Sequence, residues 1–306
     1  MISKILDLKK KKNAVILAHN YQLPEVQDIA DFVGDSLGLS IEASKTKADI
    51  IVFCGVHFMA ETAKLLNPLK KVLMPEPLAG CPMANMADAA ALKAAALKHP
   101  KAKIVCYINS TAKVKALSDI CCTSGNAVEV VRSLGNEEVL FVPDQYLGSW
   151  VKEKLGTKMV LWPGFCNIHV KILPEHINEA KRSHPEALVM CHPECTPAVR
   201  ALADVVASTS KMIEYPGDSV RANVRLPLQY IVGTEVGILH QLKKNYPGLS
   251  FYPAYENSIC PNMKLTTLEK VLWCLEEENG EIKVDPGTAE KAVVCIRKML
   301  DLGSKA

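Results

Sequence analysis

The sequence lacks the signals of membrane, secreted and nucleotide-binding proteins. No apolar run approaches the roughly 18 residues of a membrane helix, and the N-terminal stretch has no apolar core of signal-peptide length. Neither G-x-G-x-x-G nor G-x-x-x-x-G-K-S/T occurs, so nucleotide binding is not supported. The longest basic run, Lys9 to Lys12, is typical of a solvated helix end rather than a nucleic-acid surface. We therefore expect a cytoplasmic protein that binds neither membrane nor nucleic acid.

What the sequence does contain is 11 cysteines among 306 residues, and no two of them form a C-x-x-C pair. In a reducing compartment such cysteines are thiols, metal ligands or core residues rather than a disulfide framework. Hydrophobic residues make up 49% of the chain and charged residues 23%, which is ordinary globular usage. The length allows about two or three domains.

Three copies of one pattern follow each other, about every 85 to 90 residues. Each copy opens with an apolar strand that ends in polar residues: VILAHNY, IVCYINS and LVMCHPE. The corresponding position at the strand end is held by His19, Asn109 and His192. Hydroxyl residues follow at an expected helix start, and these are Ser36, Ser124, and Ser208 with Thr209. Each copy then runs through a second strand and helix into a third strand.

Strands that alternate with helices predict parallel sheets covered by helices. We expect an α/β protein of three homologous three-layer αβα modules, with short parallel sheets arranged in a triangle around a pseudo-threefold axis. The expected modules are residues 1–82 plus 264–306, residues 83–170 and residues 171–263. Because ligands bind at the carboxyl ends of parallel strands, the polar groups of all three copies should face one central site.

A cysteine follows the third strand of every copy, at Cys81, Cys166 and Cys260, in loops that contain Pro or Gly. Thiolates bind iron-sulfur clusters or zinc, and the local cysteine pairs of structural zinc sites are absent. Three thiolates from distant segments suit one 4Fe-4S cluster whose fourth iron has no protein ligand. The remaining cysteines are expected in the core, and they are Cys54, Cys106, Cys121, Cys122, Cys191, Cys195, Cys274 and Cys295.

Ordered motifs along nearly the whole chain resemble the quinolinate synthase family, the A protein of bacterial and archaeal NAD biosynthesis. The motifs are LAHNYQ, GDSLGLS, CYINS, SGNAVEVV, PDQYLG, WPGFCNIH, HPEC, STSKMI, GTEVG and CPNMKLTTL. The resemblance implies three αβα domains and a 4Fe-4S cluster on Cys81, Cys166 and Cys260. It also implies condensation of iminoaspartate with dihydroxyacetone phosphate to quinolinate, phosphate and two waters. An aspartate oxidase or aspartate dehydrogenase would supply the iminoaspartate.

The resemblance also assigns site residues. It implies substrate contacts at His19, Ser36, Tyr107, Asn109, Ser124, His192, Glu194 and Thr209. It makes Tyr21 and Glu194 the acid/base groups, and elimination of water is chemistry that positioned His, Tyr and Glu side chains perform. Ser208 joins the set through the repeat, and His169 lies either behind Cys166 or toward the substrate. Some relatives carry C-x-x-C-x-x-C at the last ligand, whereas Cys260 here has no such partners.

Structural interpretations stand beside these roles. His19 and His192 are also consistent with satisfied buried histidines, Tyr21 and Tyr107 with strand-end aromatics, and Glu194 with a cap of the helix that begins TPAVRAL. A zinc hydrolase or deaminase is a competing function, because HPE fits the H-x-E element of zinc deaminases, although their P-C-x-x-C partner is absent. A non-enzymatic iron-sulfur sensor is another alternative, but it would not need so many polar groups at one edge.

Overall fold

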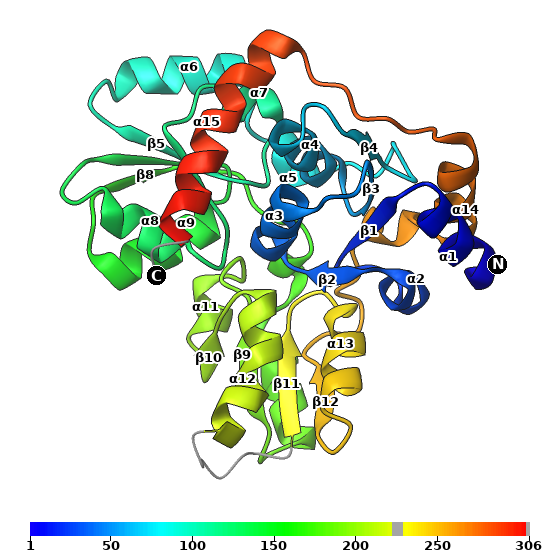
Figure 1. Cartoon of the computed structure of the whole chain (residues 1–306). Coiled ribbons are helices and arrows are strands. Elements are labelled where there is room, and N and C mark those ends of the chain that lie inside the picture. Colours follow the sequence, from blue (N-terminus) through cyan, green and yellow to red (C-terminus); the bar gives the residue numbers. More distant parts are fainter. Residues whose placement is uncertain (222–228, 304–306) are drawn as a thin grey trace.

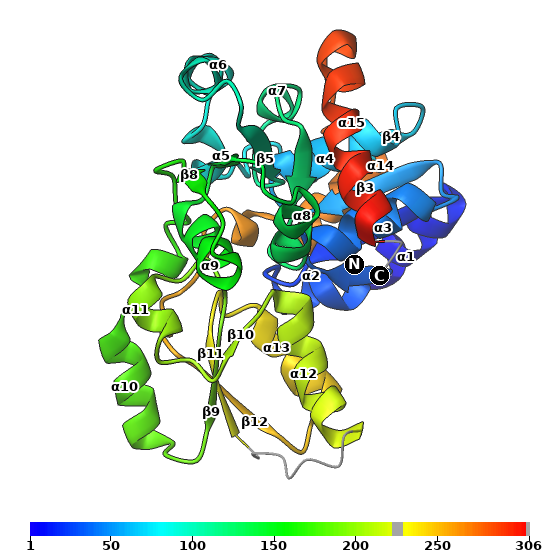
Figure 2. The same ribbon diagram turned by 90° about the vertical axis from the view of Figure 1, so that its left-hand side faces the viewer.

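Three parallel four-stranded sheets with helices packed on them form the frame of this α/β protein (Figures 1 and 2). The structure, a computed structural model, describes residues 1–221 and 229–303. The first sheet contains β1 (Ala14–His19), β2 (Phe32–Gly34), β3 (Ile50–Cys54) and β4 (Lys71–Leu73). The second contains β5 (Lys103–Tyr107), β6 (Ile120–Cys122), β7 (Val139–Val142) and β8 (Met159–Leu161). The third contains β9 (Leu188–Cys191), β10 (Val205–Val206), β11 (Gln229–Gly233) and β12 (Ser250–Pro253).

Helices connect the strands of each repeat. Those of the first are α1 (Ile2–Lys11), α2 (Pro24–Ile29), α3 (Ser36–Lys45), α4 (His57–Leu66) and α5 (Pro82–Asn85). Those of the second are α6 (Ala89–Lys98), α7 (Ala112–Lys115), α8 (Ala127–Ser133), α9 (Gln145–Leu155) and the 3₁₀ turn η1 (His169–Lys171). Those of the third are α10 (Pro174–Ser183), α11 (Pro197–Arg200), α12 (Thr209–Arg221), α13 (Ile238–Asn245) and the 3₁₀ turn η2 (Met263–Leu265). The chain continues through α14 (Leu268–Glu277) and α15 (Pro286–Gly303).

The strand order is the same in all three sheets: β2-β1-β3-β4, β6-β5-β7-β8 and β10-β9-β11-β12. This identity confirms the α/β class and the internal repeat that the sequence predicted. The prediction of three strands per copy was wrong, because β2, β6 and β10 each form a fourth strand. These strands have only two or three residues, which is too short for a hydrophobic alternation to be recognised.

An aspartate ties the start of each central strand to the chain 15 residues later. The backbone N–H of Ile16, Ile104 and Val189 donates at 2.8 Å to the carboxylates of Asp31, Asp119 and Asp204, respectively. Each aspartate precedes the short second strand, and its own N–H donates back to the carbonyl of the same strand residue. The contact is therefore a structural signature of the repeat.

The apolar core is shared unequally among the repeats. One continuous cluster joins the first and second repeats, whereas the two faces of the third sheet have clusters of their own. Helix α15 packs on α7 and β6 of the second repeat and also on α4 of the first, and α14 packs against α1 and β3. Helix α15 thus stabilises the contact between the first two repeats, whereas α14 packs on the first repeat. The module boundaries at residues 82, 170 and 263 stay a prediction.

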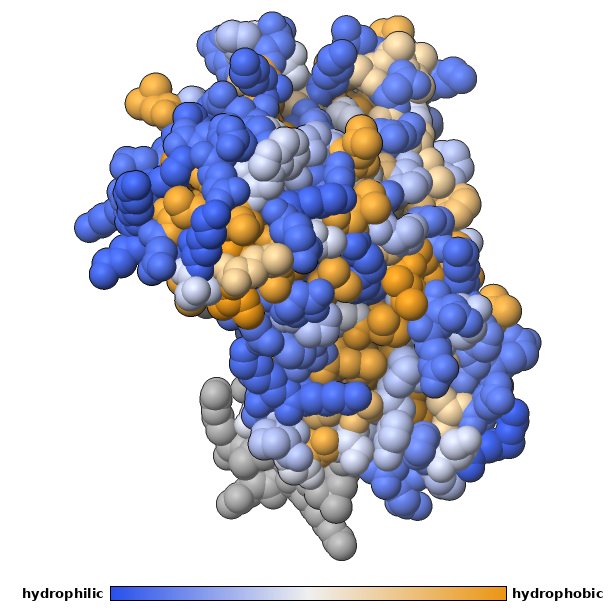
Figure 3. All heavy atoms as spheres, turned by 90° about the vertical axis from the view of Figure 1, so that its right-hand side faces the viewer, coloured by the Kyte–Doolittle hydropathy of each residue, from blue (hydrophilic) through white to orange (hydrophobic). Residues whose placement is uncertain are grey.

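The surface carries no membrane-spanning element within the described ranges, because no helix there is long and apolar enough to cross a bilayer. On the face shown in Figure 3, hydrophilic side chains cover most of the outer surface and hydrophobic ones gather near its middle.

The basic run ends helix α1, with Lys9, Lys10 and Lys11 in its last turn, as the sequence predicted. Lys12 follows the helix and pairs with Glu278 at 2.8 Å.

Candidate active site

One cavity collects residues from the carboxyl ends of strands in all three sheets. Its empty space is about 690 Å³, part of it open to solvent. It is lined by most of the residues that the sequence selected, namely His19, Tyr21, Ser36, Cys81, Tyr107, Asn109, Ser124, Cys166, His169, His192, Glu194, Thr209 and Cys260. The parallel topology explains this, because strands of one direction present their ends at the same edge of a sheet.

The three candidate ligand cysteines share one local geometry. Each stands just before a short helical turn, α5 for Cys81, η1 for Cys166 and η2 for Cys260. Backbone N–H groups two and three residues later approach each sulfur: Met83 and Ala84, Ile168 and His169, and Asn262 and Met263. Burial raises the pKa of all three thiols, that of Cys81 to about 12, and these N–H groups oppose the rise. Such N–H groups favour the thiolate, which is the form that binds metal.

Two buried carboxylates fix the backbone of two of these cysteines. The N–H of Cys166 donates to Oδ2 of Asp144 at 3.1 Å, and the N–H of Cys260 donates to Oε1 of Glu235 at 3.0 Å. Both acids are fully buried. Asp144 follows β7 and Glu235 follows β11, and each of these strands is the third in the spatial order of its sheet. The described contacts of Cys81 include no such carboxylate, so this support is present in the second and third repeats only.

The cysteine sulfurs do not converge on one point. Among the described residues, the group whose ligand atoms all lie within 4.8 Å of one another is Cys166, His169 and Glu194, with Cys81 and Cys260 outside it. A single ion could therefore bind the mixed group, whereas a ligand common to the three thiols has to be larger than one ion. The remaining cysteines are buried, as the sequence predicted.

His19 and His192 occupy equivalent places and are held in the same tautomer. Nδ1 of His19 accepts the N–H of Tyr21 at 3.1 Å, and Nδ1 of His192 accepts the N–H of Glu194 at 3.3 Å. Burial lowers the pKa of each imidazole to about 3, so both are neutral near pH 7. With Nδ1 as an acceptor, the proton is on Nε2, and each ring can donate one hydrogen bond from that atom. The two residues are thus satisfied buried histidines that also line the cavity.

A continuous chain of polar contacts joins Tyr21 to Glu194. The Tyr21 hydroxyl lies 2.6 Å from Oγ1 of Thr234, which lies 2.8 Å from Nε2 of His169. Nδ1 of His169 lies 2.7 Å from Oε2 of Glu194, whose Oε1 accepts the Tyr107 hydroxyl at 2.5 Å. His169 therefore lies behind Cys166 in sequence but between two candidate acid/base groups in space. All five side chains are buried or half-buried.

The ionisation of this chain follows from its contacts. Burial opposes the charge on Glu194, but the neighbouring His169 and His192 outweigh it and hold the pKa of the carboxyl at about 2. Burial, followed by the charge of Glu194, raises the pKa of Tyr21 and of Tyr107 well above 10. Near neutral pH this row of polar contacts thus contains one carboxylate, Glu194, and two neutral phenols, Tyr21 and Tyr107. The interpretation of Glu194 as a helix cap was wrong, because Thr196 is the N-cap of α11.

The hydroxyl residues differ in their positions. Ser36 is the first residue of α3 and Thr209 the first of α12, as predicted, while Ser124 precedes α8 by three residues. Thr209 Oγ1 accepts a hydrogen bond from Asn20 at 3.0 Å. Ser208 is not among the residues that line the cavity, and its hydroxyl accepts the N–H of Lys211 at 3.4 Å. Asn109, by contrast, lines the cavity, and its buried Oδ1 has no hydrogen-bond partner among the described residues.

Sequence reasoning missed Thr234, Asp144, Glu235 and Lys264. The first three come directly after a strand, in the motifs GTEVG and PDQYLG, so the position at the sheet edge could have selected them. Lys264 follows Cys260 by four residues, and no pattern in the sequence shows that its side chain turns inward.

Comparison with known proteins assigns the chain to a family. The profile of the family described as Quinolinate synthetase A protein matches residues 3–301. The chain belongs to this family. A relative named quinolinate synthase from Dehalococcoides mccartyi (strain CBDB1) is 53% identical over 297 residues, which is 97% of this chain and 96% of the relative. One of the same name from Thermodesulfovibrio yellowstonii is 52% identical over 302 residues, 98% of each chain. Another, from Alkaliphilus metalliredigens, is 50% identical over 303 residues, 99% of this chain and 98% of the relative.

Membership in the quinolinate synthetase A family confirms the resemblance that the ordered motifs indicated. The motifs that carry the resemblance also supply residues that line the cavity. GDSLGLS provides Ser36, WPGFCNIH provides Cys166 and His169, and CPNMKLTTL provides Cys260.

Proposed function

We propose that the chain is a quinolinate synthase, which condenses iminoaspartate with dihydroxyacetone phosphate to give quinolinate, phosphate and two waters in NAD biosynthesis. Family membership supports this activity, as does the name quinolinate synthase of relatives that are about half identical over nearly their whole length. The observation that carries the proposal is the set of three equivalent cysteines around the cavity, each before a helical turn whose N–H groups face its sulfur.

The proposed cofactor is one 4Fe-4S cluster on Cys81, Cys166 and Cys260. The residues fit it, since they are soft thiol donors from three repeats that open on one cavity and do not meet at a single-ion distance. When bound, the group would supply an iron without a protein ligand, which acts as a Lewis acid toward oxygen atoms. Iron-sulfur ligation by three cysteines also leaves the acids and histidines of the cavity free for the substrates.

The proposed substrate contacts suit anions with several oxygens. Iminoaspartate has two carboxylates and dihydroxyacetone phosphate has one phosphate group, and both can accept from the Nε2–H of neutral His19 and His192. Ser36 and Thr209 add hydroxyls at the first residue of a helix, where the N–H groups and the dipole favour negative charge. Asn109, Ser124 and Tyr107 provide further donors at the cavity wall.

Glu194 and Tyr21 are the proposed proton-transfer groups. Glu194 is ionised and can accept a proton at a carboxylate oxygen, whereas Tyr21 is a neutral phenol that can donate one. Thr234 and His169 lie between them and join the two groups by a row of polar contacts. Removal of two waters and one phosphate requires both functions in one site.

The remaining proposals concern the cellular context. Iminoaspartate would come from an aspartate oxidase or an aspartate dehydrogenase, and the enzyme would work in the cytoplasm. These assignments rest on the chemistry of the family, not on a feature of this cavity.

Metal analysis separates the proposal from a zinc hydrolase. Protein purified without oxygen should contain about four iron atoms with matching sulfide, and Cys81→Ser and Cys260→Ser should lose them. Neither residue belongs to the group Cys166, His169 and Glu194, so a single zinc ion there would survive both substitutions. One zinc ion retained in these two variants would contradict the cluster. Cys54→Ser, in the core of β3, is the matched control and should keep all four iron atoms.

A further inference from the structure

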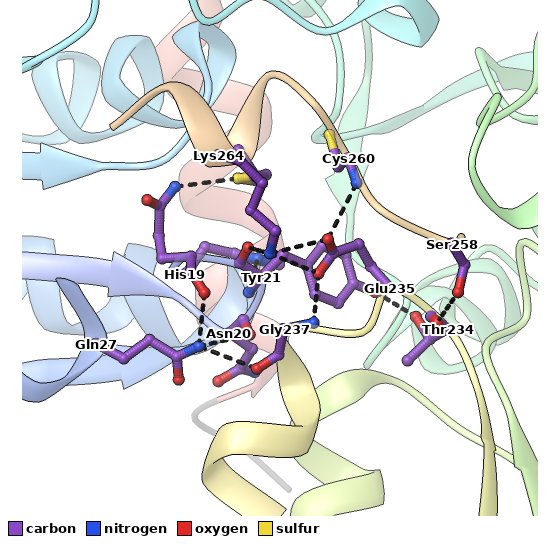
Figure 4. A network of polar contacts seen from close by, with 12 residues as sticks. His19, Asn20, Tyr21, Gln27, Thr234, Glu235, Gly237, Ser258, Cys260 and Lys264 are labelled. Atoms are coloured by element: carbon purple, nitrogen blue, oxygen red, sulfur yellow. Dashed lines mark hydrogen bonds and ion pairs between the residues drawn. The ribbon is translucent and has the colours of Figure 1, made fainter. Parts of the chain in front are cut away.

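Partly buried Lys264 and fully buried Glu235 form an ion pair between the Cys260 turn and the loop after β11 (Figure 4). Nζ of Lys264 lies 2.9 Å from Oε1 of Glu235 and donates to Oε2 at 3.2 Å. The carboxylate also accepts the N–H of Cys260 at 3.0 Å and that of Gly237 at 2.7 Å. A fully buried carboxylate needs such a set of partners, since an unpaired charge in the interior is strongly destabilising.

The same ammonium group donates to the carbonyl oxygen of Tyr21. Tyr21 lies in a turn after β1, outside strands and helices, and side chains satisfy the carbonyls of this segment. Nε2 of Gln27 donates to the carbonyls of Asn20 and Gln22, at 3.2 and 2.9 Å. Lys264 donates to the carbonyl of Tyr21, which lies between these two residues. Of these two side chains, Gln27 belongs to the first repeat, whereas Lys264 comes from the turn that begins at Cys260.

The space around this pair leaves no room for adjustment. A Cβ atom on Gly237 would lie 2.8 Å from Oε2 of Glu235, 2.8 Å from Nζ of Lys264 and 2.9 Å from the carbonyl carbon of Tyr21. Gln22, which follows Tyr21 in the sequence, donates from Nε2 to Sδ of Met263 at 3.4 Å. The N–H of Met263 in turn faces the sulfur of Cys260. A shift of the Cys260 turn is therefore transmitted to the Tyr21 segment by two separate contacts.

We propose that Lys264 is a positioning residue that couples the Cys260 ligand turn to Tyr21. With the Cys260 turn in the conformation seen in this structure, Lys264 fixes the Tyr21 backbone, and the Tyr21 hydroxyl lies 2.6 Å from Oγ1 of Thr234. The inference deepens the proposed function and rests on it for the role of Tyr21. It adds that loading of the cysteine site orders a proton-transfer group on another repeat.

Amide hydrogen exchange tests the coupling without activity. In wild type, reconstitution of metal-free protein with iron and sulfide should slow exchange in the peptide around Tyr21 and Gln22 by about tenfold or more. Lys264→Met should abolish this slowing. Because that variant leaves Glu235 unpaired, Lys264→Met with Glu235→Gln removes both charges and keeps the test valid if the single variant unfolds. Lys244→Met is the matched control, since Lys244 pairs with Asp28 between the same two repeats but at the exposed surface.

Kinetics provide the second readout. Lys264→Met should lower kcat by about 10²-fold with little change in KM, and it should have no further effect in a Tyr21→Phe background. Equal slowing of exchange in wild type and both Lys264 variants, or an absence of slowing in wild type, would overturn the coupling. The coupling would also be overturned if the kcat losses of Lys264→Met and Tyr21→Phe multiplied in the double variant. If wild type forms no quinolinate, the proposed function fails, while the exchange result still decides the coupling.

Discussion

Nδ1 of His169 lies 2.7 Å from Oε2 of Glu194, although the two residues come from different repeats. Glu194 follows the first strand of the third repeat, β9, by three residues, and His169 opens the turn after Cys166 in the second. Thr234 extends the contact to Tyr21 of the first repeat. The site is thus assembled only when all three repeats meet, and each prediction below follows from one part of that assembly.

Thr234→Val should lower kcat by about 10 to 10²-fold, because it removes the hydroxyl between Tyr21 and His169 and leaves a side chain of similar size. KM should change little. Steady-state kinetics of the reconstituted enzyme provide the measurement. Thr266→Val is the control, since Thr266 is also buried but its hydroxyl has no hydrogen-bond partner within the described part of the chain. Equal losses in both variants would mean that the hydroxyl of Thr234 has no special role.

Glu194→Gln and Tyr21→Phe should keep the fold and the iron content but lower kcat by about 10² to 10⁴-fold, as for a lost general acid or base. Product analysis by mass spectrometry should show a condensed but incompletely dehydrated compound in at least one variant. A loss confined to KM would show that the residues only bind substrate, because an interaction made equally in ground and transition states does not raise kcat.

The free energy of unfolding of the metal-free protein should fall as the pH drops below about 6.5. The folded pKa of His19 and His192 is about 3, below the ordinary 6.5, so the unfolded chain binds protons that the folded chain does not. Each histidine should contribute a slope of about 1.4 kcal/mol per pH unit between these limits. The carboxyl of Glu194, with a folded pKa of about 2 against 4.5, adds to the loss only at lower pH.

Denaturant titrations between pH 7 and pH 5 measure this slope. His19→Asn should reduce it, and asparagine suits the position because the second repeat has Asn109 there. An identical slope in wild type and His19→Asn would contradict the neutral buried imidazole.

Asp119→Ala should lower the free energy of unfolding by about 1 to 3 kcal/mol, because the N–H of Ile104 loses its acceptor. The equivalent changes at Asp31 and Asp204 should have similar effects, since the contact is 2.8 Å long in all three repeats. Denaturant unfolding measures the three losses. A negligible loss at all three positions would show that the repeated contact does not stabilise the sheets.

The sequence predicted those parts of the molecule that repeat. The three central strands, the residues His19, Asn109 and His192 at their ends, and the cysteines after the last strands recur at fixed places, so comparison of the copies identified them. Strands β2, β6 and β10 were missed because pairing with a neighbour, and not their own two or three residues, makes them strands.

The sequence could not show contacts that differ among the repeats. Thr234 and Lys264 contact Tyr21 from loops of another repeat, and each lies more than 200 residues from it in the sequence. Ser208 shows the opposite error, since its repeat position suggested a place at the cavity, but α12 begins one residue later and Thr209 takes that place. Side-chain direction at a helix start depends on a shift of one residue, which no pattern in a single sequence fixes.

The most direct test is an anaerobic assay of purified, reconstituted protein with dihydroxyacetone phosphate and freshly generated iminoaspartate. Quinolinate should form together with one phosphate per turnover, and Cys81→Ser, Cys166→Ser and Cys260→Ser should lose this activity together with the iron, while Cys54→Ser keeps both. A wild-type protein with a full complement of iron and sulfide that forms no quinolinate would contradict the account, as would full activity in any of the three ligand variants.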